Sequence, residues 1–133
     1  MNSISLNGDP AGLSRIVFFS GQEDEDARRL LAAVQRAIPA NRLESFGSLD
    51  EFGRRLRASK AEHLVSVLLA SDRQELEGMQ DLRDLLKGTH VILVIPDQET
   101  KTIELAHRLL PRFLRLKCGD FKDLESVLGR IVR

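Results

Sequence analysis

The sequence has 133 residues, the length of one ordinary domain, and its 20 Lys and Arg balance its 20 Asp and Glu. No overall field therefore favours nucleic acid or an anionic membrane, and no apolar run approaches the roughly 20 residues that span a bilayer. The single cysteine, Cys118, excludes an intrachain disulfide and fits a cytoplasmic setting. Residues 1–14 are polar and lack the pattern of a signal peptide, so we expect a flexible leader followed by one domain over residues 15–133.

The first half of that domain alternates apolar runs with helical patterns. Residues 15–19 form a continuous apolar run, which predicts a strand covered on both faces. The acidic cluster at 23–26 suits the first turn of a helix that Pro39 ends. Residues 42–46 predict a weak, half-exposed strand, and Ser48–Glu51 has the spacing that caps a short helix.

The second half continues the same alternation. In chain order it predicts a strand at 64–70, a helix that opens after Gly78, a strand at 90–95, a helix that ends at Pro111, an edge strand at 112–117 and a helix capped by Asp120. The helical periodicity before Pro111 comes from Ile103, Ala106, Leu109 and Leu110.

Five strands, each followed by a helix, require right-handed crossovers and a parallel sheet. The first, third and fourth strands are the most apolar, and these are the interior strands of the strand order 2-1-3-4-5. The sequence therefore predicts an α/β protein with a flavodoxin-like three-layer sandwich and about five helices.

The element order and the stretch Gly78-Met79-Gln80-Asp81-Leu82-Arg83-Asp84-Leu85 resemble the receiver domain of two-component response regulators over residues 15–132. The resemblance implies a phosphorelay site at the carboxyl ends of the strands. There an acid pair binds magnesium, an aspartate accepts the phosphoryl group, and a hydroxyl and a lysine hold the product.

Most of these family positions hold other residues in this chain. Ser20 and Gly21 stand at the acid pair, Ala70 at the phosphoacceptor, Ile95 and Pro96 at the hydroxyl, and Lys117 at the lysine. A lone lysine at a strand end is most often solvated, so Lys117 by itself indicates no chemistry. We therefore expect a non-catalytic, receiver-like signalling domain that acts through protein–protein interaction, is not an enzyme and needs no cofactor.

Two alternatives remain open. In a different register Asp72 would be the phosphoacceptor, with Glu23 and Asp24 holding Mg²⁺ at the same edge of the sheet. The domain could instead bind a nucleotide or a flavin, although the chain has no glycine-rich phosphate loop.

The expected partner surface is the one that receivers use, made by the fourth helix, the fifth strand and the fifth helix. It contains Glu104, Arg108, Arg112, Phe113, Arg115 and Asp123. Mixed charges and an aromatic suit a polar interface with a protein partner or a second copy of the chain, and not one with nucleic acid or membrane. His63 and His90 begin two strands, so we expect them near each other at the amino edge of the sheet.

Overall fold

The computed structural model describes residues 14–59 and 63–131. Residues 1–13 of the expected leader and the last two residues of the expected domain lie outside the described residues. Ser14 is buried beside the first strand and therefore belongs to the domain.

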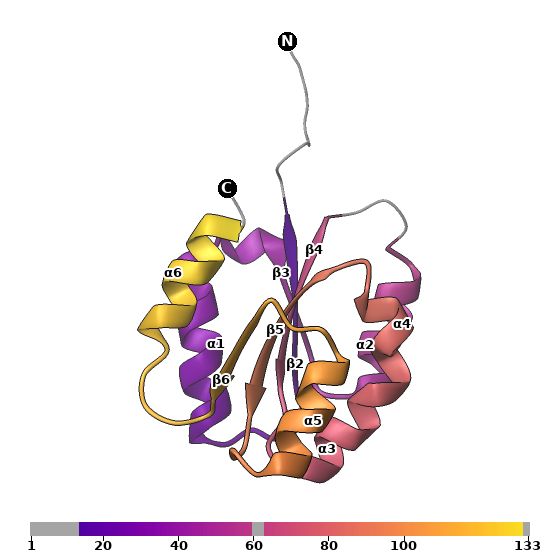
Figure 1. Cartoon of the computed structure of the whole chain (residues 1–133). Helices are drawn as coiled ribbons and strands as arrows, with labels where there is room; N and C mark the ends of the chain where they lie inside the picture. The colour runs from indigo at the N-terminus through magenta and orange to yellow at the C-terminus, as the bar shows by residue number, and fades with distance from the viewer. Residues whose placement is uncertain (1–13, 60–62, 132–133) are drawn as a thin grey trace.

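Five parallel strands form one sheet in the order β3-β2-β4-β5-β6 (Figure 1). The strands are β2 (Arg15–Ser20), β3 (Leu43–Phe46), β4 (Leu64–Leu69), β5 (His90–Ile95) and β6 (Phe113–Leu116). This is the order 2-1-3-4-5, and the predicted flavodoxin-like α/β class is confirmed. Because all the strands are parallel, their carboxyl ends meet at one edge of the sheet, the carboxyl edge.

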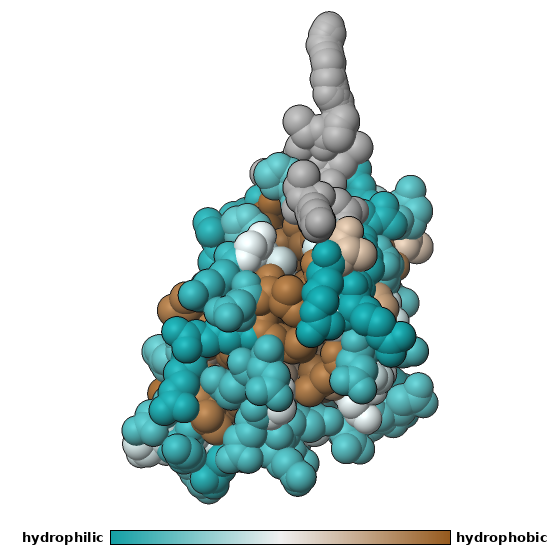
Figure 2. Space-filling view, turned by 90° about the vertical axis from the view of Figure 1, so that its right-hand side faces the viewer, coloured by the Kyte–Doolittle hydropathy of each residue, from teal (hydrophilic) through white to brown (hydrophobic). Residues whose placement is uncertain are grey.

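Helices cover both faces of the sheet. They are α1 (Glu25–Ala37), α2 (Leu49–Arg57), α3 (Arg73–Met79), α4 (Arg83–Leu86), α5 (Thr100–Arg108) and α6 (Lys122–Ile131). Figure 1 shows α1 and α6 on one face and α2 to α5 on the other. On the α2–α5 face, apolar atoms reach the surface at the centre of a frame of hydrophilic side chains (Figure 2). None of the described helices is long and apolar enough to cross a membrane.

The core consists of two apolar layers, one on each side of the sheet. All six residues of β4 are buried, because β4 is the central strand and both of its faces are covered. Successive side chains alternate between the layers, so that Val67 faces α1 and α6 while Leu68 faces α2 to α5. Ser66 is the buried polar residue of β4, and its hydroxyl donates to the Thr89 hydroxyl over 3.0 Å.

The prediction that a helix opens after Gly78 is wrong for the third crossover, which connects β4 to β5. Helix α3 begins at Arg73, because Asp72 caps it by accepting the Glu75 N–H over 2.8 Å. Gly78 lies inside α3, where a Cβ would be 3.2 Å from Leu49 of α2. Its role is therefore the close approach of two helices. A 3-10 turn at Gln80–Leu82 then joins α3 to α4, so that one continuous stretch forms this crossover.

The periodicity before Pro111 is also misleading at its last residue. Leu109 is buried, but Leu110 lies beyond α5 and is 64% exposed. Leu110 has a φ of 54°, in the left-handed region, and its N–H donates to the carbonyl of His107. The chain needs this conformation to leave the helix and turn towards β6.

Candidate functional site

The carboxyl edge carries no acidic side chain at the ends of β2 or β4. Ala70 follows β4, is fully buried, and donates its N–H to the Val94 carbonyl over 2.9 Å. Its methyl group belongs to the apolar layer beneath α2 to α5. Ser20 ends β2 and donates its hydroxyl to the Gln22 carbonyl over 2.7 Å, and Gly21 follows it. These positions supply neither a carboxylate nucleophile nor a pair of metal ligands.

A carboxylate does reach this edge, and it comes from helix α3. Glu75 Oε1 accepts the N–H of Ser71 over 2.8 Å, just beyond Ala70. The other oxygen of Glu75 lies against Gly21, where any Cβ would collide with it. Glu75 therefore bridges the ends of β2 and β4, and Gly21 leaves the space it occupies.

The role of Glu75 was not predicted from the sequence, although the sequence carries one signal for it. Asp72 and Glu75 have the spacing of a capping box, which places the glutamate in the first turn of a helix and close to the preceding loop. We expected the helix to start after Gly78, and that error hid the signal.

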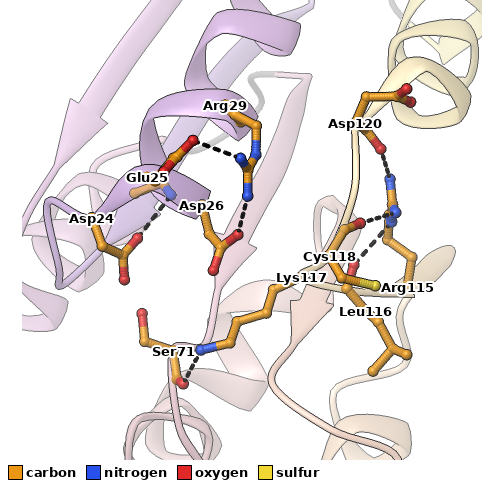
Figure 3. A network of polar contacts seen from close by, with 11 residues as sticks. Asp24, Glu25, Asp26, Arg29, Ser71, Arg115, Leu116, Lys117, Cys118 and Asp120 are labelled. Carbon is orange, nitrogen blue, oxygen red and sulfur yellow. Dashed lines mark hydrogen bonds and ion pairs between the residues drawn. The ribbon is translucent and has the colours of Figure 1, made fainter.

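Lys117 also points into this edge (Figure 3). Its Nζ donates to the Ser71 carbonyl over 2.9 Å, and its backbone N–H donates to Ile95 over 3.0 Å. Lys117 is half-buried, so the expectation of a solvated lysine is wrong. The loop after β4 is thus held from both sides, by Glu75 at the Ser71 amide and by Lys117 at the Ser71 carbonyl. The Ser71 hydroxyl is buried and has no hydrogen-bond partner among the described residues.

The last residue of β5 and the residue after it carry no hydroxyl, unlike the corresponding positions of a receiver. Ile95 is buried in the core, and Pro96 follows it. Asp97 comes next, and the nearby Thr102 hydroxyl, followed by the Glu99 amide at 3.0 Å, lowers the pKa of its carboxyl. Asp97 therefore remains ionised and stabilises the start of α5.

The alternative magnesium site is not assembled in this structure. Asp24 caps α1 by accepting the Ala27 N–H over 2.9 Å, and Asp72 caps α3. Glu23 lines a separate cavity of about 510 Å³ beside Ser45 of the edge strand β3. Within residues 14–59 and 63–131, no group of three or more His, Cys, Asp or Glu side chains is placed to hold a metal ion. Helix capping therefore accounts for two of the three carboxylates of that alternative.

A second cavity, of about 390 Å³, opens at the carboxyl edge between the start of α1 and the ends of β5 and β6. Lys117 and Arg29 line it together with Asp26 and Asp97. Arg29 forms ion pairs with Glu25 over 2.9 Å and with Asp26 over 2.8 Å (Figure 3). Because its charges are balanced in this way, the cavity lacks the excess of donors that an anionic phosphate requires.

The expected partner surface divides into engaged and free residues. Arg115 donates to the carbonyls of Leu116, Cys118 and Asp120 and forms a 2.8 Å ion pair with Asp123. Its guanidinium also lies 4.5 Å from the centre of the Phe121 ring. Arg115 and Asp123 therefore fix the loop between β6 and α6.

Phe113 packs against the layer beneath α1 and α6 and is only partly exposed. Glu104, Arg108 and Arg112 are exposed. Of the six residues expected on this surface, these three are exposed and form no ion pair with another described residue, whereas Asp123 is exposed but paired with Arg115.

Comparison with known proteins supports the fold. A crystal structure of a protein from Burkholderia pseudomallei, provisionally described as pilus assembly-related, superposes with a TM-score of 0.66. The two sequences are 22% identical, and the match covers 96% of this chain and 95% of the other. No known family profile and no curated protein sequence matches the chain. At this identity the likeness shows a shared fold and nothing further.

Proposed function

We propose that this chain is a non-catalytic, receiver-like domain of bacterial-type signalling that acts by binding a protein partner and is not phosphorylated on aspartate. The observation that carries the proposal is Ala70, whose buried methyl group stands at the carboxyl end of the central strand. In a parallel α/β sheet this edge is where chemistry occurs. A methyl group cannot accept a phosphoryl group, and Gly21 offers no ligand to the metal that such a transfer needs.

The hydrogen bonds of Glu75 and Lys117 at the carboxyl edge support the same proposal. The nearest carboxylate, Glu75, is bonded to a backbone amide, and Lys117 is bonded to a carbonyl where a receiver would present a carboxylate. We also propose that the domain acts in the cytoplasm. The provisional description of the Burkholderia protein adds pilus assembly as a setting in which such a docking domain could serve.

Incubation with acetyl phosphate and Mg²⁺, followed by intact-mass measurement, tests the proposal. We expect no added phosphoryl group. Asp72→Asn is the matched control, because asparagine caps a helix as well as aspartate does but cannot form an acyl phosphate. An adduct that forms on the wild type and is lost in Asp72→Asn would show that the domain is a phosphoacceptor and that our proposal is wrong.

The nucleotide or flavin alternative is tested by thermal shift. A ligand present at 100 times its dissociation constant stabilises the folded state by about 2.7 kcal/mol. We expect no such stabilisation from nucleotides or flavins, and a clear rise in melting temperature with one of them would favour that alternative.

A further inference from the structure

Leu110 differs from every other large apolar side chain in residues 14–59 and 63–131, because it alone is exposed, at 64%. Its φ of 54° lies in the left-handed region, which glycine adopts freely and leucine rarely does. Pro111 follows it, and a residue before proline is further restricted towards extended conformations. Both backbone strain and solvent exposure therefore oppose a leucine here, and a residue of this kind points to a role in binding.

The charged residues nearest to Leu110 in the sequence are basic. Arg108 and Arg112 flank it and are exposed, as is His107. No ion pair links Arg108 or Arg112 to another described residue, whereas Arg36 and Arg115 both pair with acids of α6. Two arginines beside an exposed leucine therefore have unused capacity for carboxylates.

The basic character extends onto the amino edge of the sheet. The backbone N–H of Arg112 donates to Val91 over 2.7 Å, which places Arg112 beside the first residue of β5, His90. Burial, the charge of Arg112 and the neighbouring His63 all lower the pKa of His90. Within residues 14–59 and 63–131, no carboxylate is among the groups that shift the pKa of His90.

We propose that Leu110, Arg108 and Arg112 form a docking surface, the Leu110 surface, for an acidic protein segment that carries an apolar side chain. This inference rests on the proposed function and specifies its partner. The guanidinium groups would bind carboxylates in bidentate geometry, and the leucine would be buried by the partner's apolar side chain. A nucleic acid backbone offers no apolar group to cover Leu110, and a single leucine buries too little area to hold the protein on a bilayer.

The Leu110 surface differs from the surface expected from the resemblance to receivers. Phe113 is half-buried and Arg115 is paired with Asp123, so the Leu110 surface does not include these three residues. The new centre, Leu110, was assigned to the helix by its sequence pattern. Its exposure becomes evident only once α5 is seen to end at Arg108.

Leu110→Asn provides the decisive variant, because asparagine tolerates the left-handed conformation and removes the apolar side chain without straining the backbone. It should be at least as stable as the wild type in urea. A loss of binding in this variant therefore cannot be attributed to unfolding. Arg108→Glu/Arg112→Glu removes the charge component. Its matched control is Arg54→Glu/Arg57→Glu, which makes the same charge change on exposed residues of α2.

A random-sequence peptide library displayed on phage is the probe. We expect the wild type to enrich acidic peptides that contain an apolar residue. Synthetic copies of these peptides should bind about tenfold or more weaker to Leu110→Asn and to Arg108→Glu/Arg112→Glu, and unchanged to the control. Raised salt should also weaken binding.

Three results would overturn the inference: enrichment of basic or neutral peptides, binding that the Leu110 and arginine variants leave unchanged, or no specific enrichment. Self-association of the wild type that is lost in Leu110→Asn would identify a second copy as the occupant and would also overturn it. The proposed function fails separately, through the phosphoryl adduct, so the two failures are distinguishable.

Discussion

The contribution of Glu75 to the carboxyl edge can be measured by removing its carboxylate. Glu75→Ala deletes the acceptor of the Ser71 N–H, a contact of 2.8 Å, and an acidic group in the first turn of α3. A partly buried hydrogen bond to a charged group contributes about 2 kcal/mol, and an acid at a helix start contributes about 0.5 kcal/mol. We expect Glu75→Ala to lower the free energy of unfolding by about 2 kcal/mol. Glu77→Ala, which removes an exposed acid from the same helix, should lower it by less than about 0.5 kcal/mol.

Gly21→Ala tests whether the same carboxylate requires a glycine beside it. A Cβ at this position would collide with one carboxylate oxygen of Glu75, so the side chain must shift. We expect the shift to weaken the bond to Ser71, so the variant should lose a similar free energy. Once Glu75 is alanine, the nearest remaining atom is Cζ of Phe19 at 3.4 Å, which is an ordinary contact. Gly21→Ala should then be nearly neutral, giving a coupling energy of about 1–2 kcal/mol between the two sites.

Urea denaturation of the four proteins in this cycle measures the coupling, provided that the m-value is unchanged. Hydrogen exchange of the Ser71 amide gives a local readout and should accelerate in both single variants. Strictly additive losses would refute the argument, because they would mean that Gly21 and Glu75 act independently. A Glu75→Ala variant as stable as Glu77→Ala would refute it as well.

Three further predictions concern other polar groups. Hydrogen bonds from Arg55 and then Arg15 lower the pKa of Glu44 below its usual 4.5, so Glu44→Gln should cost about 1 kcal/mol near neutral pH. In urea titrations at several pH values, that cost should vanish as the pH falls from 4.5 through the lower folded value. The pKa of His90 is lowered from 6.5, so the unfolded state binds its proton more readily. Melting temperature should therefore drop as the pH falls below 6.5, and should drop less in His90→Gln. The guanidinium of Arg115 bonds to three carbonyls and to Asp123, which a lysine cannot reproduce. Arg115→Lys should therefore lower the free energy of unfolding measured in urea by about 1–2 kcal/mol. An unchanged stability would mean that Arg115 does not fix the loop between β6 and α6.

Much of the fold could be predicted because the relevant signals are local. The continuous apolar run of β4 indicates a strand covered on both faces, and all six of its residues are buried. Pro39 marks the end of α1, and the hydroxyl of Ser48 caps α2 by accepting the Glu51 N–H over 3.3 Å. Strand order then follows from the relative hydropathy of the strands, since the least apolar strands occupy the edges of the sheet.

The third crossover could not be predicted in the same way, because a glycine at position 78 is compatible with two different structures. A glycine can precede a helix, or it can sit inside one where a neighbour packs closely. The sequence does not show which applies until α2 is in place. Lys117 poses a related problem, since its acceptor is a backbone carbonyl, and no residue type identifies a carbonyl as the partner of a lysine.

The residues at the carboxyl edge are mutually consistent in a way that bears on function. Gly21 creates the space that Glu75 fills, Glu75 binds the amide of Ser71, and Lys117 binds its carbonyl. Each group that a receiver would use to hold a phosphoryl group is absent here or bonded to the loop itself. Because hydrogen bonds hold this loop on both sides, we expect it to keep its conformation. The proposed protein partner should therefore bind a surface that is already formed. The Leu110 surface meets that requirement. It lies at the amino end of β6, whereas Lys117 follows the carboxyl end of the same strand. Leu110 is therefore exposed without any change of conformation at the carboxyl edge.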